Sequence, residues 1–172
     1  MIRIDAARCT GCRCCEAACA FHHTGSGGRV LSRIRVVNLY EAGVDAPVVC
    51  QQCEERACLA CPEDGLTVGP LGQVVVSPTL CSACGACARS CPIGAVEIVD
   101  GIPFVCDLCG GEPRCVTACT QEAIAFVPGA GGTTSLAPFA EGSARVSPSV
   151  KRARFARALG SAVRAGWGVS RG

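Results

Sequence analysis

The cysteines are the residues of this sequence whose type and spacing point to a chemical function. The chain has 17 cysteines in 172 residues, and all but one of them fall into four short runs. These quartets are Cys9, Cys12, Cys15 and Cys19; Cys50, Cys53, Cys58 and Cys61; Cys81, Cys84, Cys87 and Cys91; and Cys106, Cys109, Cys115 and Cys119. Thiolates crowded this closely favour a soft metal centre that binds several sulfur ligands at once.

Two of the quartets, the first and the third, read C-x2-C-x2-C-x3-C. This spacing places three thiolates around one [4Fe–4S] cluster and directs the fourth to a neighbouring cluster. The sequence therefore predicts that the quartets bind four [4Fe–4S] clusters, with every quartet cysteine as a ligand. The remaining cysteine, Cys14, fits no spacing, and we expect it to be a small residue packed near a cluster.

Two other uses of the cysteines compete with this interpretation. A disulfide scaffold would have an even number of cysteines and an export signal, whereas the count here is odd and no apolar run precedes the first cysteine. Structural zinc suits the CxxC pairs of the second quartet, but zinc ribbons usually separate such pairs by a dozen or more residues. A metal-stabilised structural protein without redox function remains an alternative.

The composition indicates a small α+β fold built around cofactors. Aromatic residues make up only 4% of the chain, which also contains 21 Gly and 10 Pro. Short β-rich runs lie before or after the quartets, for example at residues 34–40, 74–76 and 102–105. We expect two ferredoxin-like dicluster modules, with short strands and short helices around four clusters, followed by a C-terminal helix. The apo protein should be largely disordered.

The C-terminal part differs in composition from the rest. We predict a four-cluster polyferredoxin domain over residues 1–128, a flexible linker over 129–147 and a basic amphipathic helical tail over 148–172, with its helix ending near 166. The helix carries an apolar stripe of Phe155, Leu159, Val163 and Trp167. Residues 142–172 contain seven basic and no acidic residues, against nine basic and fourteen acidic in residues 1–141.

Three roles are open for this basic helix. It could fold back on the acidic body or dock into a partner subunit. It could lie on a membrane surface, although no membrane contact is expected overall. Nucleic-acid binding is not expected, because an anionic body repels phosphate.

The sequence contains no pattern typical of a substrate site. There is no nucleophile–base pair, phosphate-binding glycine loop or dinucleotide fingerprint outside the quartets, so we expect no enzyme activity from this chain alone. The chain has neither a long apolar run nor a twin-arginine leader, which predicts a cytoplasmic location. His22 and His23 follow the first quartet, and their imidazoles either donate to a cluster sulfur or simply end a helix.

Four segments carry a family resemblance: residues 9–25 (CTGCRCCEAACAFHHTG), 32–37 (SRIRVV), 48–62 (VVCQQCEERACLACP) and 106–119 (CDLCGGEPRCVTAC). They resemble the four-cluster iron–sulfur subunits of the dimethyl-sulfoxide-reductase type. Within that group they are most similar to the small electron-transfer subunits of tungsten aldehyde ferredoxin oxidoreductases and benzoyl-CoA reductases. The resemblance spans roughly residues 1–128.

This resemblance implies an electron-transfer subunit between a catalytic subunit and an electron partner. The catalytic partner would be a tungsten or molybdenum pterin enzyme, with a tungsten aldehyde oxidoreductase expected first. The electron partner would be a flavin subunit or a soluble ferredoxin. Equivalent subunits of formate dehydrogenase, hydrogenase or carbon monoxide dehydrogenase systems are the alternative.

The family also implies nested ligation, in which the first quartet pairs with the fourth and the second with the third. Carried onto this chain, the four ligand groups would be Cys9, Cys12 and Cys15 with Cys119; Cys106, Cys109 and Cys115 with Cys19; Cys50, Cys53 and Cys58 with Cys91; and Cys81, Cys84 and Cys87 with Cys61. One spacing departs from the family pattern, since only Leu59 and Ala60 separate Cys58 from Cys61. On a helix, this shortening would rotate Cys61 by about 100° from the expected position.

A pair of serine variants tests the ligand assignment. Cys61→Ser should damage the inner pair of clusters because a ligand is lost, whereas Cys14→Ser should leave all four clusters intact. Electron paramagnetic resonance spin counts on the reduced variants measure this difference. Loss of signal in the Cys14 variant would show that the ligands are misassigned.

Overall fold

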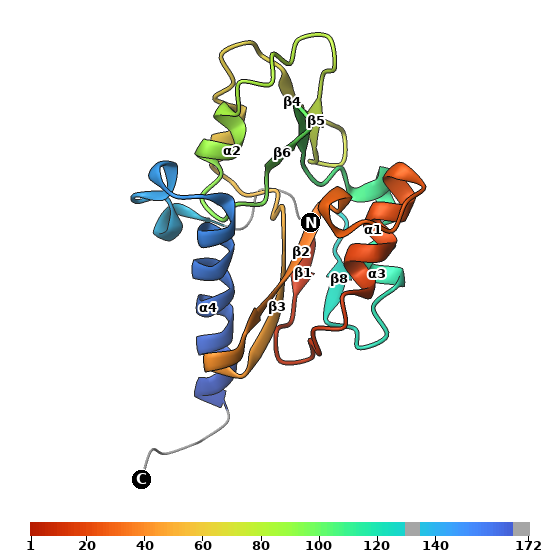
Figure 1. The fold of residues 1–172 in the computed structure, drawn as a ribbon, viewed down its shortest axis with the longest axis vertical. Helices are drawn as coiled ribbons and strands as arrows, with labels where there is room; N and C mark the ends of the chain where they lie inside the picture. The colour runs from red at the N-terminus through yellow and green to blue at the C-terminus, as the bar shows by residue number, and fades with distance from the viewer. Residues whose placement is uncertain (130–134, 167–172) are drawn as a thin grey trace.

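Strands from opposite ends of the cysteine-rich region pair with each other. The structure, a computed structural model, describes residues 1–129 and 135–166. Strand β1 (Ile2–Ile4) pairs antiparallel with β8 (Ile124–Phe126), with Ile2 opposite Phe126. Helices α1 (Cys14–Thr24) and α3 (Arg114–Thr117) lie side by side next to this ribbon (Figure 1). The first quartet is therefore brought next to the fourth.

The remaining strands form three more two-stranded antiparallel ribbons, β2–β3, β4–β5 and β6–β7. The strands are β2 (Ile34–Leu39), β3 (Val44–Val49), β4 (Leu66–Val68), β5 (Val74–Val76), β6 (Glu97–Val99) and β7 (Ile102–Phe104), and the other helices are α2 (Ala86–Ser90) and α4 (Pro148–Gly166). This is a small α+β fold of short elements. The longest ribbon, β2–β3, runs through the middle of the molecule (Figure 1).

Strands β2, β5 and β7 lie where the sequence predicts them, but β1 and β3 were not predicted. Strand β1 has only three residues, and β3 contains Pro47, which ordinarily argues against a central strand. In a two-stranded ribbon both strands are edges, so a proline can be accommodated without breaking a second ladder.

The core is aliphatic and includes cysteines. Ile34, Val48 and Val49 of the β2–β3 ribbon are buried, and they belong to the same cluster as buried thiols such as Cys50 and Cys106. Large aromatic side chains contribute little to this cluster, in agreement with the composition. The interior of the domain therefore consists of small aliphatic side chains and sulfur.

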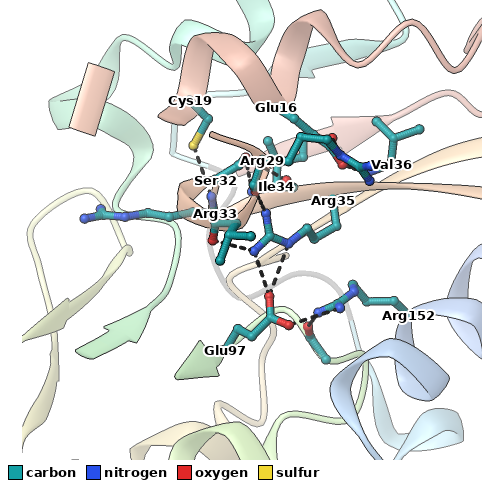
Figure 2. A network of polar contacts seen from close by, with 12 residues as sticks. Glu16, Cys19, Arg29, Ser32, Arg33, Ile34, Arg35, Val36, Glu97 and Arg152 are labelled. Carbon is teal, nitrogen blue, oxygen red and sulfur yellow. Dashed lines mark hydrogen bonds and ion pairs between the residues drawn. The ribbon is translucent and has the colours of Figure 1, made fainter. Parts of the chain in front are cut away.

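A buried carboxylate ties α1 to β2. Glu16 is fully buried, and its side chain accepts a 2.6 Å hydrogen bond from the Val36 N–H. It also pairs with Arg29 at 2.8 Å (Figure 2). Arg13 lies 3.4 Å from the same carboxylate. A buried carboxylate is costly unless its oxygens are paired in this way. Glu16 follows Cys15 directly, so the network fixes the helix that carries two cysteines of the first quartet.

Helix α4 folds back along the β2–β3 ribbon (Figure 1). Of the predicted apolar stripe, Phe155 is buried and Leu159 and Val163 are partly buried in the core. Basic residues of the helix pair with the body: Arg152 lies 3.3 Å from Glu97, and Arg157 lies 2.6 Å from Glu41. Folding back on the acidic body is therefore the arrangement observed among the roles open for this helix. No helix in the described part of the chain is long and apolar enough to cross a bilayer.

The described part of the predicted linker over 129–147 contacts the rest of the domain. Residues 135–147 form two 3₁₀ turns, Ala137–Phe139 and Ser143–Arg145, and Leu136 is buried. The Leu136 N–H donates to Glu55 at 3.1 Å, and Phe139 packs edge-to-face on Phe155. The apolar side chains of Leu136 and Phe139 therefore hold this segment against the domain. The high Gly, Ala, Ser and Pro content of the segment as a whole hides these two residues from a prediction based on composition. Trp167, the last residue of the predicted stripe, lies outside the described residues.

Glu16→Ala should destabilise the protein by breaking the link between α1 and β2. Removing one partner of a buried ion pair costs about 3–5 kcal/mol, which corresponds to a fall of roughly 10 °C or more in the thermal midpoint of a domain of this size. Thermal unfolding of the anaerobically reconstituted protein, followed by circular dichroism, measures the change. The matched control is Glu122→Ala, since Glu122 pairs with Arg8 at 2.7 Å on the exposed surface and its loss should have little effect. Equal midpoints for the two variants would contradict the prediction.

Candidate iron–sulfur site

All four cysteine loops share one unusual backbone conformation. The residue before the second cysteine is left-handed in each loop: Gly11 (φ +69°), Gln52 (φ +44°), Ala83 (φ +57°) and Leu108 (φ +61°). Non-glycine residues adopt this conformation at a cost of about 1–3 kcal/mol, and surrounding structure must hold them there. Left-handed turns make neighbouring N–H groups point into a common hollow, which is suited to an anionic group such as an iron–sulfur cluster.

The structure brings the cysteines together in three-plus-one groups. Each group takes three cysteines from one quartet and the fourth cysteine of another. We define them as site 1 (Cys9, Cys12, Cys15, Cys119), site 2 (Cys106, Cys109, Cys115, Cys19), site 3 (Cys50, Cys53, Cys58, Cys91) and site 4 (Cys81, Cys87 and Cys61, with Cys84 assigned by the sequence prediction).

Site 1 surrounds a small cavity. All four of its cysteines line the cavity, together with Val36 and Pro47 of the β2–β3 ribbon. Burial raises the pKa of Cys9, and the charges of Cys12 and Cys119 raise it further. Burial and the neighbouring Glu16 raise the pKa of Cys15 to about 12. Four thiols from two distant segments therefore face one hollow.

Site 2 joins the fourth quartet to the last cysteine of the first. Burial, followed by the charges of Cys19 and Cys109, raises the pKa of Cys115 to about 12. Burial also raises the pKa of Cys106, and the charges of Cys115 and Cys19 add to this effect. The packing of α1 against α3 places Cys19 in this group.

Site 3 and site 4 join the second and third quartets. Burial, then the charges of Cys91 and Cys53, raises the pKa of Cys58 to about 12. Burial raises the pKa of Cys87, with further contributions from the charges of Cys81 and Cys61. Cys84 is exposed on the loop between Cys81 and Cys87.

The expected rotation of Cys61 does not apply, because the segment is not α-helical. A 3₁₀ turn covers Ala57–Leu59, and Ala60 leaves it with φ −70° and ψ 49°. Because the helix is interrupted here, the backbone accommodates a spacing that is one residue shorter. Cys61 lies close enough to Cys87 to raise the pKa of Cys87. The shortened spacing therefore leaves Cys61 beside the third quartet.

The four sites follow one another in a row. Cys15 of site 1 is an electrostatic neighbour of Cys115 of site 2, and Cys106 of site 2 is a neighbour of Cys50 of site 3. Cys58 of site 3 is in turn a neighbour of Cys87 of site 4. Each end of the row has an exposed cysteine, Cys12 in site 1 and Cys84 in site 4.

Backbone N–H groups donate to the sulfur of the crossing cysteines. The amide of Ala95 lies 3.2 Å from Cys91 Sγ, and that of Ala123 lies 3.3 Å from Cys119 Sγ. In each case the donor is four residues after the cysteine, so the two loops repeat one geometry. Such bonds stabilise sulfur in its charged form and influence the potential of a bound cluster.

His23 contacts the sulfur of another quartet. Its Nε2 atom lies 3.8 Å from Cys109 Sγ and 3.5 Å from Asp107 Oδ1. Burial and the nearby charge of Arg33 lower the pKa of His23, so the neutral imidazole is favoured. Of the two roles open for the histidine pair, the sulfur contact is the one observed, and it reaches site 2. His22 packs edge-on against His23.

Cys14 is not packed as expected. It is exposed at the start of α1, and hydrogen bonding with the Cys12 thiolate raises the pKa of Cys14. A hydrogen bond from the Cys14 backbone N–H lowers the pKa of Cys12. Cys14 also lines the cavity of site 1, so it lies near that site, as predicted, although its side chain is exposed. All seventeen cysteines are free thiols, so the disulfide alternative is not observed.

The residues present fit [4Fe–4S] clusters. Each site offers only sulfur donors, the loops present backbone amides to the sulfurs, and site 1 encloses a hollow. Soft thiolate donors in sets of four suit iron–sulfur clusters, and the same set could also hold zinc.

Comparison with known proteins identifies the family. The model of the 4Fe-4S binding domain matches residues 74–97, which include the third quartet. The polyferredoxin-like subunit of the aliphatic sulfonate oxidoreductase of Pyrococcus furiosus is 39% identical over 135 residues, covering 74% of this chain and 78% of the relative. The chain belongs to the polyferredoxin-like family of iron–sulfur electron-transfer subunits.

Two further proteins are similar to this chain at lower identity. Formate hydrogenlyase subunit 2 of Escherichia coli is 28% identical over 163 residues, covering 72% of this chain and 79% of the relative. Among solved structures, a chain of the BamBC active-site complex of benzoyl coenzyme A reductase is 28% identical, with a TM-score of 0.45 and coverage of 74% of this chain and 78% of that chain.

Gly11→Ala should prevent site 1 from holding its cluster. A Cβ at this position would lie 2.5 Å from Asp45 Oδ2, and φ is +69°. Gly25→Ala is the matched control, because its φ of +67° imposes the same strain while nothing lies within 4 Å of the added Cβ. We expect Gly11→Ala to lose about four iron atoms per chain after reconstitution and Gly25→Ala to keep them, with only about 1 kcal/mol of destabilisation. Full iron content in Gly11→Ala would contradict this role of the loop.

Proposed function

We propose that this chain is the electron-transfer subunit of an oxidoreductase complex and that its sixteen quartet cysteines bind four [4Fe–4S] clusters at sites 1 to 4. The single observation that carries the proposal is the row of four three-plus-one thiol groups with an exposed cysteine at each end. When bound, the clusters supply one-electron redox chemistry. A row that reaches the surface at both ends supports transfer between two partners.

The chain's own residues hold and insulate this row. Buried aliphatic side chains such as Val36, Val48 and Val49 exclude water from the interior thiols. The amides of Ala95 and Ala123 hold two crossing sulfurs in place. Low reduction potentials are expected, because all-cysteine ligation and an acidic body favour the oxidised state.

The catalytic partner would be a tungsten or molybdenum pterin enzyme, and a tungsten aldehyde oxidoreductase subunit is the first candidate. Support comes from the motif resemblance and from a relative that is a subunit of an aliphatic sulfonate oxidoreductase. A flavin subunit or a soluble ferredoxin would bind the other end of the row. The complex would work in the cytoplasm, where a reducing environment keeps cysteines available as cluster ligands.

A formate dehydrogenase or hydrogenase system is the second candidate. It is supported by the similarity to formate hydrogenlyase subunit 2. In either complex we propose that this chain has no substrate site of its own and transfers electrons for the catalytic subunit. The protein that co-purifies under anaerobic conditions discriminates between the candidates, since a pterin-tungsten subunit would support the first.

Iron and acid-labile sulfide determination tests the cofactor assignment. The protein purified and reconstituted without oxygen should contain about sixteen of each per chain, as four cubane clusters require. Dithionite reduction should then produce the spectra of several interacting clusters in electron paramagnetic resonance. Chelation of the metal should unfold the domain, since the thin aliphatic core depends on ligation. Bound zinc without sulfide would contradict the proposal and favour a structural protein.

A further inference from the structure

The first turns of α4 bury a lysine beside site 3. Lys151 is 1% exposed and is the largest residue among the described ones whose side chain is fully buried. Lysine is rarely buried to this extent without a partner, because desolvating an ammonium group is costly. Its burial therefore requires a specific set of acceptors.

Three backbone carbonyls accept the protons of this ammonium group. The Nζ atom donates to the carbonyls of Ala88 at 3.1 Å, Arg89 at 2.7 Å and Cys91 at 3.0 Å. An ammonium group has three N–H donors, so its hydrogen-bonding capacity is filled. These acceptors lie in the last turn of α2 and just after it, where carbonyls have no partner within the helix. The ammonium is thus held in one place with its full charge.

This position lies next to a proposed cluster ligand. The Lys151 Nζ atom is 3.0 Å from the carbonyl oxygen of Cys91, whose sulfur belongs to site 3. The same Cys91 sulfur accepts the Ala95 N–H at 3.2 Å, in the turn against which α4 packs. The ammonium therefore lies in the immediate environment of that site.

The helix that carries Lys151 is closely fitted to the turn after Cys91. Gly94 approaches α4 so closely that a Cβ there would lie 2.2 Å from the Pro148 carbonyl oxygen. Arg152 donates to the Gly94 carbonyl at 3.0 Å and to Glu97, which also binds Arg35 at 2.9 Å (Figure 2). Glu97 therefore shares one negative charge between Arg35 and Arg152. The three acceptors of Lys151, in contrast, are uncharged carbonyls.

We propose that Lys151 is a positioning residue that raises the reduction potential of the cluster at site 3 relative to those at sites 1, 2 and 4. This inference rests on the proposed function. Uptake of one electron adds one negative charge to the site, and a cation fixed nearby in a medium of low dielectric constant stabilises that charge. Lys151 would then stabilise an added electron at an inner site of the row.

Potentiometric titration of Lys151→Met, monitored by electron paramagnetic resonance, tests this role. Methionine removes the charge while keeping an unbranched side chain. We expect one of the four potentials to fall while the other three and the iron content stay unchanged. Arg157→Met is the matched control from the same helix, and it should leave the potentials at their wild-type values because Arg157 pairs with Glu41 on the exposed surface, where solvent screens its charge.

The outcomes separate this inference from the proposed function. Four clusters with unchanged potentials in Lys151→Met would overturn the inference and leave the proposed function intact. Absence of clusters from the wild-type protein would overturn the proposed function itself. If Lys151→Met loses iron, Lys151→Gln distinguishes a role in charge from a role in structure. Glutamine keeps two N–H donors but carries no charge. A Gln variant that also loses iron would show a purely structural lysine and overturn the inference, whereas four clusters with one lowered potential would support it.

Discussion

Crowding of thiols in a water-poor interior is the constraint on which the rest of this structure depends. Burial and mutual repulsion raise the pKa of Cys15, Cys58 and Cys115 to about 12, so the bare protein resists ionising the groups that would bind metal. Ligation of iron replaces those protons and provides the opposing charge. The loop residues Gln52, Ala83 and Leu108 also fit a bound group. Their left-handed backbone conformation costs free energy and serves to surround such a group.

The nested pairing of the cysteine quartets joins short helices and strands into a single domain. Ribbon β1–β8 and the packing of α1 on α3 join the outer quartets, while the inner quartets meet around α2. None of these elements could be stable alone, because three-residue strands and helices of one or two turns bury too little surface. Each crossing cysteine belongs to one quartet in sequence and to another in space, which couples folding of the whole domain to the cofactors.

Helix α4 adds charge compensation to this body. The region before residue 142 is acidic, and proposed clusters would make it more so. Arg152 and Arg157 pair with carboxylates of the body, and Lys151 brings an ammonium to the carbonyls around Cys91. A basic helix that could be taken for a free tail therefore packs against the domain, and Lys151 is the basic residue that lies beside site 3.

The sequence by itself determined the chemistry and the local elements. Cysteine spacing acts within a single loop, so the four quartets, the sulfur-only donor sets and the α+β class could be predicted without tertiary information, as could the helix ending at Gly166. The spacing predicts that a quartet gives its fourth cysteine to another cluster, but which quartets pair was available from the sequence only through family resemblance. Only the tertiary structure decided that α4 folds back, that His23 reaches Cys109 instead of its own quartet, and that Lys151 lies beside Cys91. These contacts join residues 60 or more positions apart, and their formation depends on how separate elements pack, which no local pattern encodes.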